Sequence, residues 1–97
     1  MDYHIPAKYQ NDIEIAADLL KKEGCESIYL FGSLVTGKIH PNSDIDIGIK
    51  GLPPGKFFNV YAKLDNSISN NMDLVYFDVN DKFYELLSSL GEVVKIE

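Results

Sequence analysis

The chain contains 97 residues, carries a formal net charge of −6 and is 45% hydrophobic. This length is typical of one domain, since single domains usually run from about 50 to 250 residues, so we expect residues 1–97 to fold as a single unit. The acidic balance argues against DNA or RNA as a general partner, because such binding depends on Lys and Arg neutralising phosphates. A basic partner fits the charge better.

The sequence also bears on location and redox chemistry. No stretch approaches the ~18 apolar residues of a membrane span, and Met1 to Gln10 lacks the apolar core of a signal peptide. We therefore expect a cytoplasmic protein that does not enter a membrane. Cys25 is the only cysteine, which excludes an internal disulfide and a cysteine metal cluster and favours a small buried side chain.

The first half of the chain predicts a helix, a strand, a turn and a second strand. Pro6 suits the first turn of a helix, apolar residues then recur at helical spacing, and Gly24 is placed to end it. Residues 26–31 form a short β-rich run that Gly32 stops, and residues 36–43 carry turn residues. Residues 44–50 alternate acid and isoleucine, which predicts a strand with its isoleucines in the core and its aspartates on the opposite face.

The second half continues the alternation of helices and strands. We expect a loop over residues 51–55, a helix over 56–66, a polar connection over 65–71 and a strand over 72–77. Asn80 can cap a helix that runs to residue 90, where Gly91 ends it, and residues 93–96 form a last strand. This order predicts an α/β (α+β) fold, a small mixed sheet of about four strands with helices packed on it.

Three strand aspartates, Asp44, Asp46 and Asp73, have no obvious cationic partner, and the chain contains no arginine. Asp44 and Asp46 would lie about 7 Å apart on one face of their strand. At an effective dielectric constant of about 20, two such charges repel by roughly 2 kcal/mol. A divalent metal would relieve this repulsion, and Mg²⁺ takes one or two carboxylates and completes its shell with water and substrate phosphates.

Two other nucleotide or metal motifs are partly matched and rejected. Residues 32–38 cover most of a P-loop, which needs Ser or Thr after its lysine and a following helix. Here Ile39 follows the lysine, and Pro41 prevents a long helix. The aspartate pair also opens an EF-hand loop, but Ile49 and Gly55 stand where that loop requires glycine and glutamate.

Three segments together resemble the minimal nucleotidyltransferases of the DNA polymerase beta superfamily, short prokaryotic proteins commonly paired with a HEPN toxin. These segments are Gly32-Ser33-Leu34-Val35-Thr36-Gly37, Ser43-Asp44-Ile45-Asp46-Ile47 and Met72-Asp73-Leu74-Val75. The resemblance covers most of the chain, and ten residues separate the Gly-Ser pair from the Asp-x-Asp motif, as in that family.

The resemblance implies a role for each motif residue. Gly32 and Ser33 would hold the nucleotide phosphates, Asp44 and Asp46 would bind Mg²⁺, and Asp73 would help to bind metal and activate the attacking hydroxyl. The implied reaction moves AMP from ATP to a hydroxyl, a tyrosine of a HEPN toxin, so the protein would be the antitoxin and assemble with that toxin as a hetero-oligomer.

Two positions depart from the family pattern. Leu34 and Thr36 stand where members often carry basic residues, so phosphate binding could depend on Lys38 instead. This leaves open a catalytically weak binding module that neutralises the toxin by contact alone. Transfer to RNA ends or to a small molecule is a third hypothesis, against which the acidic charge and the lack of room for a second domain count.

Overall fold

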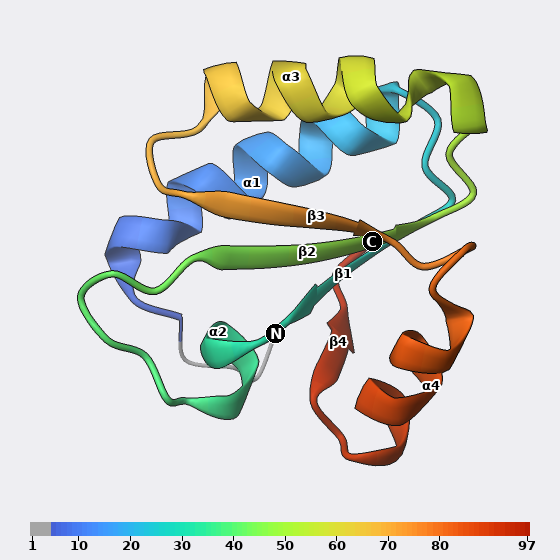
Figure 1. Ribbon diagram of the computed structural model, residues 1–97. Coiled ribbons are helices and arrows are strands. Elements are labelled where there is room, and N and C mark those ends of the chain that lie inside the picture. Colours follow the sequence, from blue (N-terminus) through green and yellow to red (C-terminus); the bar gives the residue numbers. More distant parts are fainter. Residues whose placement is uncertain (1–4) are drawn as a thin grey trace.

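The computed structural model describes residues 5–97 and contains a four-stranded mixed sheet with helices on both faces (Figure 1). The absence of a signal peptide was predicted over residues 1–10, of which residues 1–4 lie outside the described part. In chain order the elements are α1 (Ala7–Lys22), β1 (Ser27–Phe31), α2 (Ser33–Thr36), β2 (Ile45–Lys50), the 3-10 turn η1 (Pro54–Lys56), α3 (Phe57–Ser67), β3 (Met72–Tyr76), α4 (Asp81–Ser89) and β4 (Val93–Lys95). The predicted α+β fold is confirmed.

The strands lie in the order β3-β2-β1-β4. β1 pairs antiparallel with β2 and with β4, whereas β2 and β3 are parallel. A parallel pair needs a crossover connection, and α3 supplies it between β2 and β3. This crossover brings two strands that carry aspartates side by side.

The larger hydrophobic core lies between the sheet and the two longer helices, α1 and α3, which cover one face together (Figure 1). Ile45, Ile47 and Ile49 of β2 are fully buried on this face. The predicted core face of the strand is therefore confirmed, because the period of two sends the intervening residues to the other side.

A smaller, aromatic core lies on the opposite face of the sheet, under α4. Tyr29 and Phe31 of β1 pack there with Phe77 and with Leu87 of α4. The ring centroids of Tyr29 and Phe77 are 5.6 Å apart, and those of Phe31 and Phe77 are 5.7 Å apart. α4 covers only part of this face, which leaves the aspartate side of β2 less enclosed.

The structure corrects two local details. The segment after Gly32, expected to be a turn, forms the four-residue helix α2 before its chain turns at Gly37. Asn80 occupies the N-cap position of α4, as predicted, but its side chain does not cap the helix. Its amide nitrogen instead donates a hydrogen bond back to the carbonyl oxygen of Tyr76 at 2.9 Å.

Cys25 is buried between α1 and β1, as expected, and burial raises the pKa of its thiol to about 11. Across residues 5–97, no helix combines the length and the apolar character needed to cross a membrane.

Candidate active site

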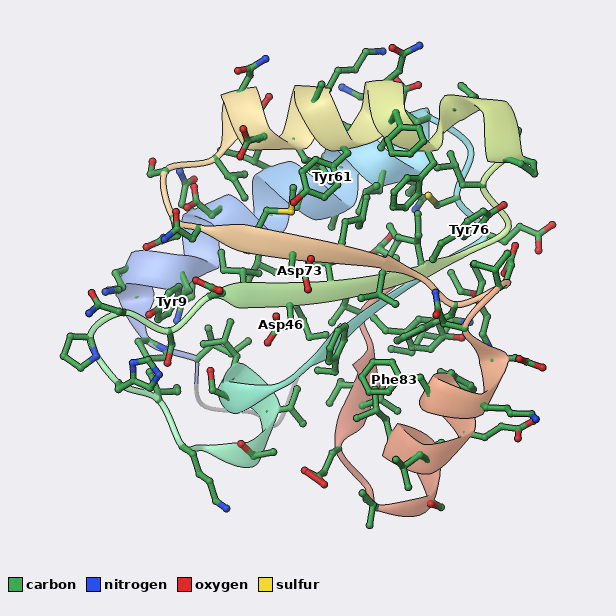
Figure 2. All side chains as sticks on the ribbon, in the orientation of Figure 1. Tyr9, Asp46, Tyr61, Asp73, Tyr76 and Phe83 are labelled. Atoms are coloured by element: carbon green, nitrogen blue, oxygen red, sulfur yellow. The ribbon has the colours of Figure 1, made fainter. Side chains whose placement is uncertain are left out.

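The parallel pairing of β2 and β3 places Asp46 directly beside Asp73. Partners in neighbouring strands project from the same face of a sheet, and Figure 2 shows both side chains on the face flanked by α2 and α4. Asp46 is half-buried, Asp73 is exposed, and Asp44 is exposed one residue before β2 begins. The structure thus brings Asp46 and Asp73 together and leaves Asp44 at the strand entrance.

The charges of these carboxylates act on one another. Burial raises the pKa of Asp46 to about 6, and the negative charges of Asp73 and Asp44 add to the rise. A nearby lysine would favour the ionised form and lower the pKa instead. Asp46 therefore lies in a locally anionic environment, which favours a cation in this region.

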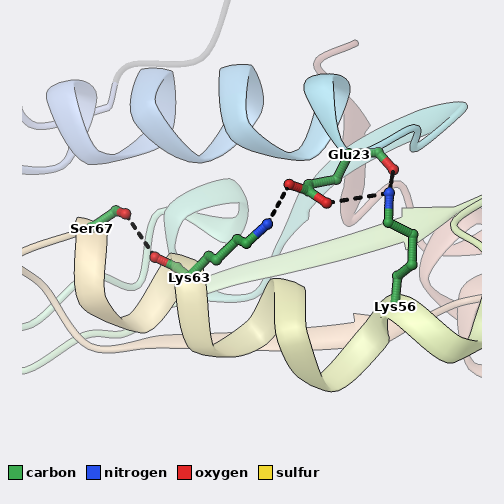
Figure 3. Close-up of polar contacts among 4 residues, drawn as sticks. All are labelled: Glu23, Lys56, Lys63 and Ser67. Atoms are coloured by element: carbon green, nitrogen blue, oxygen red, sulfur yellow. Dashed lines mark hydrogen bonds and ion pairs between the residues drawn. The ribbon is translucent and has the colours of Figure 1, made fainter.

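The ion pairs that the structure describes lie elsewhere. Glu23, at the end of α1, pairs with Lys63 of α3 at 2.8 Å and with Lys56 at 3.3 Å (Figure 3). Lys21 pairs with Glu97 at 2.9 Å. Within residues 5–97, no lysine forms an ion pair with Asp44, Asp46 or Asp73.

Gly32 is the residue through which the Gly-Ser motif lies close to the Asp-x-Asp motif. Its φ of 75° lies in the left-handed region that glycine tolerates best. A Cβ atom added here would lie 2.0 Å from the Oδ2 atom of Asp46, so any side chain would displace the carboxylate. The residue lets the turn approach Asp46 closely, which is the geometry the two motifs need to act on one ligand.

Ser33 begins α2 and is half-buried next to this turn. The short helix is closed by the backbone N–H groups of Val35 and Thr36, which donate to the carbonyl oxygen of Gly32 at 3.0 Å. Leu34 points into the larger core. Lys38 lies in the loop that follows α2 and is exposed, with no ion pair within the described part of the chain.

The loop that leads to Asp44 is fastened by residues that sequence reasoning missed. The backbone N–H of His40 donates to the Oγ atom of buried Ser43 at 2.9 Å. The hydroxyl of Tyr9, on α1, donates to the carbonyl oxygen of Ser43 at 3.1 Å. Tyr9 is 34 residues away in sequence, so no local pattern could have identified it.

Asp12 fixes the loop that leads to the strand of Asp73. Its buried carboxylate accepts hydrogen bonds from the backbone N–H groups of Ser69 and Asn70, at 3.0 and 2.8 Å, and from the Asn70 amide at 2.8 Å. Burial opposes ionisation, but these hydrogen bonds outweigh it and hold the pKa of Asp12 below its ordinary value. This role could not be predicted from the sequence, because Asp12 lies in an otherwise ordinary amphipathic helix.

The geometry suits a metal held by few protein ligands. Across residues 5–97, no three or more His, Cys, Asp or Glu side chains are arranged to enclose an ion. Mg²⁺ does not require such a cage, since it usually binds one or two carboxylates together with water and phosphate oxygens. Asp46 and Asp73 fit that mode, being adjacent in register, and the use of all three aspartates stays a prediction.

Comparison with known proteins identifies related folds and sequences. The family described as "Polymerase beta, Nucleotidyltransferase" matches residues 13–94. A crystal structure of a toxin-antitoxin with AMP-PNP is 33% identical, with a TM-score of 0.56. A toxin-antitoxin MntA-HpeT mutant, in which two aspartates separated by one residue are replaced by glutamate, is 30% identical, with a TM-score of 0.55.

Both structural matches cover 70% of this chain and 58% of the other chain. This chain therefore spans less than two thirds of the length of those chains. No curated protein matches it.

Proposed function

This chain belongs to the polymerase beta nucleotidyltransferase family, and we propose that it transfers AMP from ATP to a hydroxyl group of a partner protein. The proposed acceptor is a tyrosine of a HEPN-type toxin, so that the protein acts as the antitoxin. The toxin-antitoxin neighbours support the role, and the neighbour that contains AMP-PNP, an ATP analogue, supports the nucleotide.

The observation that carries this proposal is the convergence of the motifs on one face of the sheet. Asp46 lies beside Asp73 in register and in contact range of the Gly32 turn. Phosphoryl-type transfer depends mainly on positioning and on neutralising charge. The mutant neighbour changes an aspartate pair with the same spacing as Asp44 and Asp46, which supports the assignment of that pair to the site.

Each motif residue has a proposed task. Ser33 would bind the triphosphate through its hydroxyl, and the backbone at Gly32 would let the phosphates approach the carboxylates. Asp44, Asp46 and Asp73 would hold Mg²⁺, which would supply positive charge to the α-phosphate of the transferred AMP and to the leaving pyrophosphate. Lys38 would add a charge-assisted contact to the triphosphate.

Asp73 is the proposed general base. It is exposed, so an acceptor hydroxyl can reach it, and it would take the proton from that hydroxyl as the oxygen attacks the α-phosphorus. The new bond joins the acceptor oxygen to the α-phosphorus. The bond from the α-phosphorus to the bridging oxygen breaks, and pyrophosphate leaves with the bonding electrons.

A second candidate function is neutralisation by contact alone, and α2 supplies the observation that favours it. Leu34 is buried in the larger core and Thr36 is uncharged. α2 therefore has no cationic side chain that could bind the phosphates. A site with weak triphosphate binding could retain the partner surface while losing useful transfer.

Labelled ATP separates the two functions. The purified chain is incubated with Mg²⁺ and the product of the gene next to its own, and ATP labelled at the α- or γ-phosphate is compared. We expect α-label on the partner and no γ-label, with loss of the α-label when Asp44 and Asp46 are both changed to alanine. Unchanged labelling by that double variant would contradict the site assignment, whereas neutralisation without any labelling would support contact alone.

A further inference from the structure

α4 and its C-cap residue Leu90 present an apolar row to solvent. Phe83, Leu86 and Leu90 are 39%, 55% and 59% exposed, and their spacing of three and four residues places them on one side of a helix. Leu87, on another side, is buried against the sheet. The helix therefore has two apolar faces, one that completes the aromatic core and one that nothing in residues 5–97 covers.

The exposed row begins beside the candidate active site. The ring of Phe83 packs edge-on against Phe31, with centroids 5.5 Å apart. Phe31 is the antiparallel partner of Asp46 in the pairing of β1 with β2. A molecule bound to the row would thus lie beside β1, the strand next to the one that carries Asp46.

The charges around the row favour a basic occupant. Between residues 78 and 92 the chain carries four carboxylates, Asp78, Asp81, Glu85 and Glu92, and one lysine, Lys82. Lys50 of β2 adds a positive charge at the helix, with its Nζ atom 3.4 Å from the ring centroid of Tyr84, and the carboxylates still outnumber the lysines. The aspartates on the adjacent sheet face add to this negative field. A second copy of this chain, with its own charge of −6, would bring like charges together, which disfavours self-association here.

We propose that the row of Phe83, Leu86 and Leu90 is the docking surface for the protein that accepts the nucleotide, and that its occupant is an amphipathic helix. The spacing of the row matches the packing of one helix against another, in which side chains three and four residues apart interdigitate. Lys and Arg beside the partner's apolar row would face the carboxylates. The inference rests on the proposed function for the identity of this partner.

Another apolar surface offers a direct comparison. A pocket of about 480 Å³ lies beside β3, the edge strand, and is lined in part by Phe57, Phe58 and Tyr76. Phe58 is 85% exposed. It lies on α3, where its ring packs edge-on against Phe57 with centroids 5.6 Å apart, so a change there tests a different surface.

The test uses the full chain and the product of the gene next to its own, coexpressed and then measured as purified proteins by calorimetry. Leu86→Asp with Leu90→Asp should weaken the complex by about 100-fold or more, as expected when charge enters the centre of an apolar interface. Leu86→Met with Leu90→Met and the single change Phe58→Asp should each bind within about threefold of the parent chain.

Melting of each variant with and without Mg²⁺ and ATP shows whether the fold and the nucleotide site are intact. Both leucines are more than half exposed, so the double aspartate variant should keep the nucleotide-dependent rise in melting temperature. Lost binding with that rise retained supports the proposal. Binding unchanged in that variant, or lost in the Phe58→Asp variant instead, would overturn it.

Two further outcomes would also overturn the proposal: a parent chain that does not bind this protein, and a self-associated parent that the double aspartate variant dissociates. Failure of the proposed function would look different. In that case the complex would form and depend on Leu86 and Leu90, but no α-label would reach the partner.

Discussion

Asp46 is expected to lower the stability of the protein when metal and nucleotide are absent. The change Asp46→Asn keeps the shape of the side chain and removes its charge from a half-buried position beside Asp73. Because burial and two neighbouring carboxylates raise the pKa of Asp46, the folded state opposes ionisation more than the unfolded state does. We therefore expect the Asn variant to be more stable than the parent chain at neutral pH.

The pKa of Asp46 rises from 3.8 to about 6. A rise of about two pH units corresponds to roughly 3 kcal/mol at most, and the part of the side chain that stays in water reduces this to about 1–2 kcal/mol. The direction of the pH dependence follows from the raised pKa. The protonated side chain of Asp46 contributes stability that is fully present below pH 3.8, and this stability is lost as the pH rises through about 6.

Urea unfolding in EDTA at about pH 4, close to the ordinary pKa of 3.8, and at about pH 7.5, above the raised pKa of about 6, measures this effect. The advantage of Asp46→Asn over the parent should be small at the lower pH and reach its full value at the higher one. Asp65→Asn, on an exposed position of α3, is the control for loss of one negative charge. An Asn variant less stable than the parent at the higher pH, or an advantage independent of pH, would refute the reasoning.

Three further changes test other parts of the site. Gly32→Ala should reduce transfer strongly and destabilise the fold by at least about 1 kcal/mol, because its Cβ would collide with Asp46; labelling and thermal melting measure both, and a fully active, equally stable variant would contradict the role of this contact. Asp12→Ala should lower the free energy of unfolding in urea by about 1–3 kcal/mol near neutral pH, because it leaves two backbone N–H groups without their acceptor. This loss of stability should shrink as the pH falls and the parent carboxylate becomes protonated in both states. A loss independent of pH would argue for a packing role instead. Lys38→Ala should raise the apparent KM for ATP by up to about 100-fold while changing kcat less, since a contact made equally in ground and transition states mainly affects binding; an unchanged KM would mean that the lysine does not contact ATP.

Local patterns were sufficient for most elements of the fold. The alternation around Ile45 and Ile47 identified both faces of β2, since a strand with one buried face has a period of two. Helix positions followed from apolar spacing and from glycines that end them. The structure differs mainly over α2, where one turn of helix is too short to leave a periodic signal.

The arrangement of the site could be inferred only in part. Spacing placed Asp44 and Asp46 near the Gly-Ser turn, but it could not show that Asp73 lies in register with Asp46, because strand order is a tertiary property. Tyr9 and Asp12 act on loops far away in sequence. Their hydrogen bonds become visible only when α1 is packed against the sheet.

The contact between Gly32 and Asp46 gives a physical reason for keeping the two motifs together. The carboxylate occupies the space where a side chain at position 32 would lie, so the turn and the strand cannot change independently. Burial and the charges of Asp73 and Asp44 raise the pKa of the same carboxylate. A site that brings carboxylates together must lower the stability of the free protein, and a bound cation with its nucleotide would return that stability by mass action.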